Sequence, residues 1–303
     1  MVRAQSAICA DTGNYGLFIT LAVAEGKGMA VRRAAAKLPA LTRAVADKLG
    51  EPALVSALGI GAAAWEAVVG GPKPRGLLPF EPLADGSRVA PATPADLFLH
   101  IHSPRHDANL VLAREFLRSL DGGATVIEEV MGFKHLGGRD LTGFVDGTEN
   151  PEGDERPEVA LVAEGDAFAG GSFVSLQRYV HDMALWDRLP VAEQEKTVGR
   201  TKEDDEELDD EVKPPTAHIA RVVIEEDGEE LEVLRHSLPY GLTRECGLYF
   251  VAYCASPGPF RRMLKRMVVR DQDGHYDHLL DFTRAVTGAS FFTPSENFLE
   301  GLA

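Results

Sequence analysis

An aspartate in a glycine-flanked loop is the first residue whose surroundings point to chemistry. Residues 143–151 read Gly-Phe-Val-Asp-Gly-Thr-Glu-Asn-Pro, which places Asp146 between an apolar pair and a glycine. Apolar neighbours disfavour the charged carboxylate and raise its pKa, and glycines let the backbone pass close to a bound group. Asp146 is therefore a candidate for proton transfer. The alternative is that Asp146 and Gly147 only form a tight turn, for which Asp-Gly is a common pair.

A base and a cation follow in the second half of the chain. His218 comes after Lys-Pro-Pro-Thr-Ala, at the entrance to an apolar run that favours a β-strand. Arg235 and Ser237 flank His236 in segment 233–241, Val-Leu-Arg-His-Ser-Leu-Pro-Tyr-Gly. A neutral imidazole can act as a base or bind a metal, although a histidine near a strand is more often structural, and an arginine stays charged at working pH. Acid, base and cation are thus all present.

In this order the motifs resemble the dye-decolourising peroxidase family, haem enzymes with a G-x-x-D-G loop, then a proximal histidine and a distal arginine. The resemblance continues through segments 199–202, 247–250, 280–283 and 286–288. Within this family the chain is similar to the B-type, bacterial branch. Ser237, two residues after Arg235, indicates the subgroup that carries the motif Arg-x-Ser. The resemblance implies a peroxidase that reduces hydrogen peroxide through a ferryl intermediate and oxidises dye-like or phenolic electron donors.

The resemblance also assigns roles to residues. It implies one haem b per chain, with His218 as the iron ligand and Asp281 as the acceptor for the other ring nitrogen; Asp277 or a backbone carbonyl is the alternative acceptor. Asp146 and Arg235 would assist peroxide cleavage on the opposite haem face, and the relative contribution of each residue is left open. His236 would support the site or lie at the surface. Further residues expected at the haem are Gly147, Thr148, Glu149, Arg200, Ser237 and Phe250.

Ser237 and Phe250 have equally plausible structural roles, in local hydrogen bonding and in core packing. Other functions on the same fold also remain: a haem carrier or storage protein, which would need His218 but neither Asp146 nor Arg235, or a haem-modifying enzyme. A third alternative is a binding module without a cofactor.

Hydrophobic periodicity predicts the fold class. The first half alternates as a strand at 16–23, a helix at 29–49, strands at 53–60 and 96–102, a helix at 107–120 and a strand at 124–133. This βαββαβ order is the ferredoxin-like unit. The second half predicts strands at 171–180, 217–224, 231–235 and 248–255, and helices at 183–199 and 257–269. We therefore expect an α+β protein of two packed ferredoxin-like domains, 1–138 and 139–303, and the resemblance places the haem in the second.

Composition narrows the partners and the location. The 303 residues carry a net charge of −16 with a pI near 5.0, which argues against nucleic acid and anionic membranes. No apolar run approaches the roughly 20 residues that span a bilayer, and the amino terminus lacks a secretory signal. Three scattered cysteines fit reduced thiols. We expect a cytoplasmic protein whose partners are hydrogen peroxide and small aromatic donors, and the family implies a homo-oligomer.

Three further expectations concern less specific segments. The acidic run 202–211 lacks the spacing of a calcium loop and should be a solvated surface loop. His100 and His102 have strand spacing but no third ligand, so they are expected to be structural. The chain shows no long tail after the last motif, which predicts free protein that is not recruited into a protein shell.

Overall fold

The computed structural model describes residues 2–226 and 228–303, and its first half has the expected βαββαβ order. The elements are β1 (Tyr15–Val23), α2 (Gly28–Leu49), β2 (Val55–Gly61), β5 (Leu97–Ser103), α4 (His106–Ser119) and β6 (Ala124–Phe133). Smaller elements are α1 (Ser6–Cys9), α3 (Trp65–Val68), β3 (Leu83–Asp85) and β4 (Arg88–Ala90). Strand order is β6-β1-β5-β2, with all neighbours antiparallel.

The second half repeats this arrangement with shorter helices. Its elements are α5 (Glu155–Ala160), β7 (Ser172–His181), α6 (Met183–Trp186), α7 (Val191–Val198), α8 (His218–Val222), β8 (Glu225–Glu226), β9 (Glu229–Glu230), β10 (Leu234–Arg235), β11 (Leu238–Gly241), β12 (Cys246–Cys254), α9 (Gly258–Val268), the 3-10 helix η1 (His278–Asp281), β13 (Thr283–Ala285), β14 (Ala289–Thr293) and α10 (Glu296–Glu300). Strands run in the order β14-β7-β12-β11, which matches the first half strand for strand.

The two sheets meet at both of their edges. Strand β11 pairs with β6 at one edge and β14 pairs with β2 at the other, so the strands form a closed circuit. Side chains from both sheets fill its interior, where the Phe18 and Tyr249 rings stack with centroids 4.4 Å apart. The α+β class with two ferredoxin-like units is confirmed. The division at 138/139 stays a prediction.

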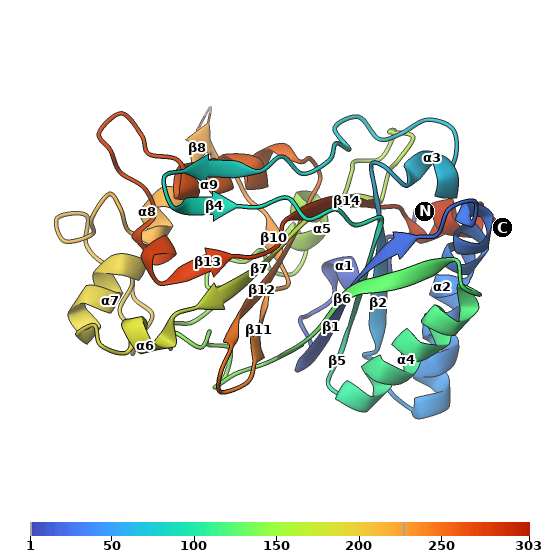
Figure 1. Ribbon diagram of the computed structural model, residues 1–303, viewed down its shortest axis with the longest axis horizontal. Coiled ribbons are helices and arrows are strands. Elements are labelled where there is room, and N and C mark those ends of the chain that lie inside the picture. The colour runs from blue at the N-terminus through green and yellow to red at the C-terminus, as the bar shows by residue number, and fades with distance from the viewer. Residues whose placement is uncertain (1, 227) are drawn as a thin grey trace.

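The outer faces of the two sheets carry different layers (Figure 1). Helices α2 and α4 pack against each other and cover the first sheet at one end of the molecule, where both chain termini also lie. At the other end lie α6, α7 and α8, and α8 packs against α9. The outer face of the second sheet is therefore covered by short helices and loops.

One expectation about the second half was wrong. Residues 217–224, predicted as a strand, contain α8, which begins at His218. The helical stretches predicted over 183–199 are confirmed as α6 and α7. The error at 217–224 falls where the local sequence is ambiguous and contacts with distant segments decide the structure.

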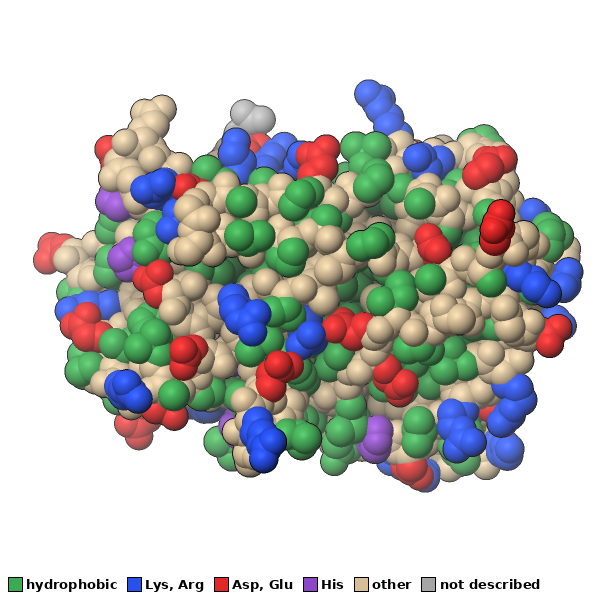
Figure 2. All heavy atoms as spheres, in the orientation of Figure 1, with side chains coloured by type: hydrophobic (Ala, Val, Ile, Leu, Met, Phe, Trp, Pro, Cys, Tyr) green, Lys and Arg blue, Asp and Glu red, His purple; other side chains and the backbone are tan. Residues whose placement is uncertain are grey.

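The surface agrees with the composition. Acidic and basic side chains are interspersed with hydrophobic ones over the face shown in Figure 2. Most residues of the acidic run 202–211 are exposed, as expected. No helix in the described part of the chain is long and apolar enough to cross a membrane.

Candidate active site

His218 is the first residue of α8 and is held by a buried carboxylate. Its Nδ1 lies 2.6 Å from Oδ2 of Asp277, whose residue is 0% exposed. A carboxylate only accepts hydrogen bonds, so the proton of the neutral ring lies on Nδ1 and the lone pair lies on Nε2. This is the arrangement of a metal-ligating histidine with its supporting acceptor.

The expected pairing of Asp281 with His218 is wrong, and the alternative, Asp277, is what the structure shows. Asp281 is exposed and accepts a hydrogen bond of 3.1 Å from the Tyr276 hydroxyl. Asp277 precedes η1 and also accepts the backbone N–H of Leu279 at 2.9 Å. The two aspartates lie at opposite ends of one short helical turn, so only one of them can face α8.

Two arginines, Arg221 and Arg266, hold helix α8 in place. The buried Arg221 donates from Nε to the Arg266 carbonyl at 3.0 Å and from Nη1 to Asp271 Oδ2 at 2.8 Å. Arg266 in turn donates to the Ala220 carbonyl at 2.8 Å. A five-residue helix has too few internal hydrogen bonds to be stable alone. These contacts therefore set the orientation of His218.

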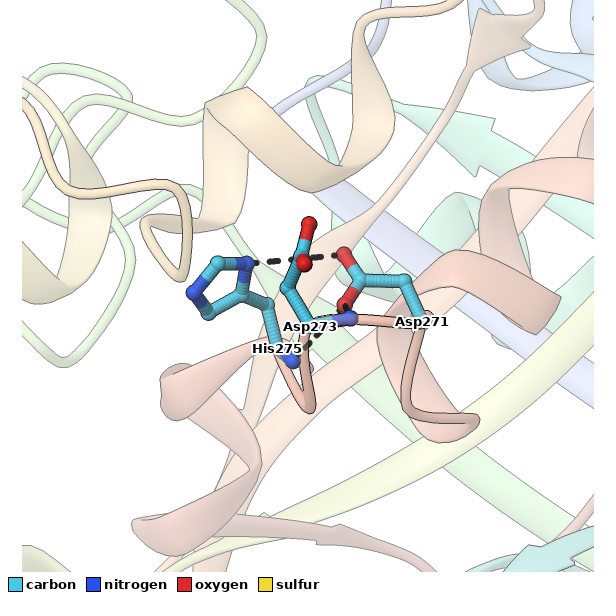
Figure 3. A group of neighbouring side chains, drawn as sticks. All are labelled: Asp271, Asp273 and His275. Carbon is cyan, nitrogen blue, oxygen red and sulfur yellow. Dashed lines mark hydrogen bonds and ion pairs between the residues drawn. The ribbon is translucent and has the colours of Figure 1, made fainter.

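Asp271, Asp273 and His275 form a small cluster in the loop after α9 (Figure 3). The Asp271 carboxylate accepts the backbone N–H groups of Asp273 and His275 at 3.0 and 2.9 Å, in addition to Arg221. Both carboxylate oxygens of Asp271 therefore already accept hydrogen bonds from the protein itself. The cluster closes the loop and connects it to α8.

Asp146 lies in a loop shaped by its glycine neighbours. Gly147 has φ +89°, a conformation that favours glycine, and its carbonyl accepts the Asn150 N–H at 3.0 Å. Burial raises the pKa of Asp146 to about 6, Arg235 and His218 oppose this rise, and Asp140 adds to it. The sequence-based expectation of a raised pKa is thereby supported. The Asp146 loop also holds the main chain of Arg235, through the side chain of Asn150.

Strand register places Arg235 on the outer face of the second sheet. Arg235 pairs with Ala252, and Phe250 pairs with Gln177. Residues two apart on a strand share a face, so Ala252 and Phe250 lie on the same side as Arg235 and Gln177. Phe250 packs there against Phe260 of α9, with ring centroids 5.5 Å apart. This is the face on which α9 packs.

Two buried polar groups near this face lack a hydrogen-bond partner in the described structure. They are the hydroxyl of Ser237 and Nε2 of Gln177. The Gln177 Oε1 is used, since it accepts from the Tyr179 hydroxyl at 2.7 Å. Buried polar atoms are nearly always paired, and an exception in a native protein needs an explanation. A bound ligand or water is one such explanation.

Residues 147–149 lie at the rim of the site. Arg200 pairs with Glu149 and donates to the Asp205 carbonyl at 2.7 Å. Thr148 donates to the Asp205 carboxylate at 2.5 Å. The Asp146 loop is therefore joined to the acidic run at 202–211. Arg200 is engaged by the protein itself.

His236 is neither at the surface nor beside His218. It is 2% exposed and its Nε2 lies 2.7 Å from the Ile8 carbonyl, in the interior between the two sheets. The His236 ring stacks with His102, and burial lowers the pKa of His236 to about 3 and that of His102 to about 4. Nδ1 of His100 forms a hydrogen bond of 2.9 Å with the hydroxyl of Tyr253. These histidines are neutral core residues, as expected for His100 and His102.

Comparison with known proteins identifies the family. Family models match residues 5–134 (Dyp-type peroxidase, N-terminal) and 137–298 (Dyp-type peroxidase, C-terminal). The dye-decolorizing peroxidase of Rhodococcus erythropolis is 42% identical over 94% of this chain and 84% of its own length.

The chain belongs to the Dyp-type peroxidase family.

Solved structures of family members superpose on nearly the whole chain. The encapsulated DyP-type peroxidase of Mycobacterium smegmatis has a TM-score of 0.95 at 39% identity and covers 99% of this chain and 98% of its own. A variant of Rhodococcus jostii RHA1 DypB in complex with heme has a TM-score of 0.94 at 36% identity, with both chains fully covered. The expectation of a dye-decolourising peroxidase is confirmed for the family.

Two residues of this Dyp-type peroxidase, Gln177 and Asn150, were missed by sequence reasoning. Gln177 and Tyr179 alternate with apolar residues along β7, and this period-two pattern of polar residues could have indicated a functional sheet face. Asn150 was interpreted only as a turn residue. Its side chain contacts the main chain of Arg235, a contact that no local sequence pattern signals.

Proposed function

We propose that the chain binds one haem b and uses it to reduce hydrogen peroxide while oxidising dye-like or phenolic donors. The observation that carries this proposal is the pair of His218 and the buried Asp277, whose carboxylate holds Nδ1 of the imidazole at 2.6 Å and leaves Nε2 for a ligand. We infer that His218 faces the same space as Asp146 and Arg235, which are linked because Asn150 of the Asp146 loop binds the Arg235 main chain. A haem in that space would supply the iron that exchanges electrons with peroxide and donor.

The residues present fit a haem. His218 has Nδ1 engaged by Asp277, which leaves Nε2 for a metal. The unpartnered Ser237 hydroxyl and Gln177 amide offer hydrogen bonds to a polar group of the cofactor or to its water. A sheet face carrying Phe250 supplies apolar contact area. The chemistry of this set would suit haem, with His218 supplying a nitrogen ligand, Phe250 an apolar contact, and Ser237 and Gln177 hydrogen bonds.

On the proximal side, Asp277 acts through His218. It accepts the Nδ1 proton, holds the ring in one tautomer and makes the ligating nitrogen more basic. Its complete burial strengthens this interaction because little water competes for the carboxylate.

On the distal side, Asp146 moves the proton of peroxide. A pKa of about 6 allows the carboxylate to accept a proton from one peroxide oxygen at neutral pH and to return it to the other. Arg235 stays positively charged and stabilises the negative charge that develops as the O–O bond breaks. Ser237 orders a water or hydrogen-bonds the cofactor. Each such proton-transfer group contributes roughly 10²- to 10⁴-fold to the rate.

The rim residues Gly147, Thr148 and Glu149 would pass the haem edge. We assign Arg200 to holding this rim through Glu149, because its guanidinium already has that partner. Phe250 would line the pocket from the sheet.

We infer that the protein works in the cytoplasm on small aromatic donors and without nucleic acid or membrane partners. The unpaired state of Cys9, Cys246 and Cys254 supports a reducing compartment. A homo-oligomer stays a prediction from the family.

Rapid mixing with peroxide tests the function. Haem-loaded parent protein should change its Soret spectrum within seconds and turn over a dye. Arg235→Leu and Asp146→Asn should still bind haem but react at least about 100-fold more slowly. The matched control is Arg118→Leu, an exposed arginine on α4. If the parent reacted with peroxide no faster than a simple open-haem protein, and both site variants reacted at the same rate as the parent, the carrier alternative would replace the peroxidase.

A further inference from the structure

The main chain of Arg235 is gripped by a single side chain from the Asp146 loop. The Arg235 N–H donates to Asn150 Oδ1 at 2.8 Å, and Asn150 Nδ2 donates to the Arg235 carbonyl at 3.0 Å. The primary amide thus satisfies both backbone groups of one residue. It occupies the place that a neighbouring strand would take.

This contact matters because β10 lies at the end of the sheet order. The two-residue strand is paired with β12 on one side only. Backbone groups on the open side of an edge strand need another partner, and here Asn150 supplies it. Arg235 would otherwise belong to a short edge segment with little to fix its position.

Asn150 is also tied to Asp146. Its own N–H closes a turn onto the Gly147 carbonyl at 3.0 Å, and Pro151, which follows it, is buried. Only three residues therefore separate Asp146 from Asn150, whose amide holds Arg235. A displacement of the amide would move the arginine relative to the acid.

We propose that Asn150 is the positioning residue that sets Arg235 against Asp146. This rests on the proposed function only for its catalytic consequence, because the contact itself exists without a cofactor. Asn150 would touch neither peroxide nor donor. Its effect on the rate would pass through Arg235, whose misplacement by a fraction of an ångström weakens charge stabilisation.

The first readout is residue-resolved hydrogen exchange of the haem-free protein. In Asn150→Ala, the Arg235 amide should exchange about tenfold faster, since it loses its acceptor. In Asn150→Asp, that amide should stay protected, because an acceptor oxygen remains while the donor to the Arg235 carbonyl is lost. Unchanged exchange at Arg235 in Asn150→Ala would overturn the proposal.

The second readout is the rate of the haem-loaded protein with peroxide. Asn150→Ala should slow it on the order of tenfold. In an Arg235→Leu background the same substitution should change the rate less than about twofold, because the residue through which it acts is gone. An equal loss in both backgrounds would contradict positioning through Arg235.

Asn150→Asp adds a pH signature. A second carboxylate near Asp146 should raise the pKa of Asp146, so the pH profile of the peroxide reaction should move to higher pH. An unchanged profile would show that position 150 does not lie close enough to Asp146 to act on it, and would count against the proposal.

Asn297→Ala is the matched control. Asn297 also accepts a main-chain N–H, that of Arg3, at 2.7 Å, but it lies on α10 beside α2. It should change neither the exchange of Arg235 nor the peroxide rate. If Asn150→Ala and Asn297→Ala had equal effects, general destabilisation would explain both and the proposal would be contradicted. A parent protein that does not react with peroxide would contradict the proposed function. The hydrogen-exchange measurements would still test the role of Asn150.

Discussion

The two halves of the molecule share one strand order but cover their sheets differently. The first sheet lies under α2 and α4, helices of 22 and 14 residues, whose inward side chains belong to one large apolar core. The outer face of the second sheet carries α9, and the adjoining α8 has only five residues. Both halves contain buried polar residues; those of the second half include Gln177 on β7, Arg221 on α8 and Asp277, which binds His218.

The difference shows how one architecture supports two roles. Long amphipathic helices bury their apolar stripes against the first sheet and leave no space for a cofactor. In the second half, short helices are held by arginine and carboxylate contacts and bring single functional groups to the sheet. We therefore expect the first half to stabilise the fold and the second to perform the chemistry.

The largest expected effect is on stability and comes from the first half. Leu112 on α4 is 0% exposed, and Leu112→Ala should lower the free energy of unfolding by about 2–5 kcal/mol because it leaves a cavity. The haem affinity of the remaining folded protein should not change. Denaturant titration and haem titration measure the two quantities. The control Leu110→Ala removes an exposed side chain of the same helix. A large change in haem affinity would break the division of roles.

A smaller effect should distinguish the two aspartates of η1. Asp277→Asn removes the charged acceptor of His218 and should weaken haem binding about 10- to 100-fold. Asp281→Asn, which only loses contact with Tyr276, should change it less than about twofold. Haem titration of both variants is the measurement. Equal losses would show that the carboxylate beside His218 has no special role.

The smallest effect concerns Asp146 and pH. Its pKa is about 6 in the folded protein and about 3.9 in an unfolded chain, so the folded state binds extra proton between these values. Stability therefore falls as pH rises from about 4 to 6. Asp146→Asn removes this penalty and should stabilise the haem-free protein at pH 7 by on the order of 1 kcal/mol, a figure reduced for solvent screening. Thermal unfolding at pH 4 and pH 7 tests it; a constant difference would rule out the raised pKa.

The first half could be predicted from sequence because its local signals agree with the fold. Its strands and the long helices of α2 and α4 show clear periods of 2 and 3.6 residues. Pro39 lies within α2 without ending it, on the buried side of the helix. Local preference and tertiary packing point to the same structure there.

The second half was predicted less well because long-range contacts decide its elements. Residues 218–222, His-Ile-Ala-Arg-Val, favour a strand locally, yet Arg221 bonds to Arg266 and Asp271 nearly fifty residues later. The choice between Asp277 and Asp281 also depends on which end of a single turn faces α8. The motif order found His218, Asp146 and Arg235, but it could not reveal their partners.

The contribution of Asn150 was beyond reach for a similar reason. Its contact with Arg235 spans 85 positions and involves main-chain groups, which carry no sequence signal.

Haem titration of the parent and of His218→Ala, followed by the Soret band, tests the central claim most directly. The account predicts stoichiometric binding by the parent and an affinity at least about 100-fold lower without His218, since even outer partners of a ligand cost up to that factor. His275→Ala, which removes a partly exposed imidazole from the neighbouring loop, should bind as the parent does. Undiminished binding by His218→Ala would contradict the account.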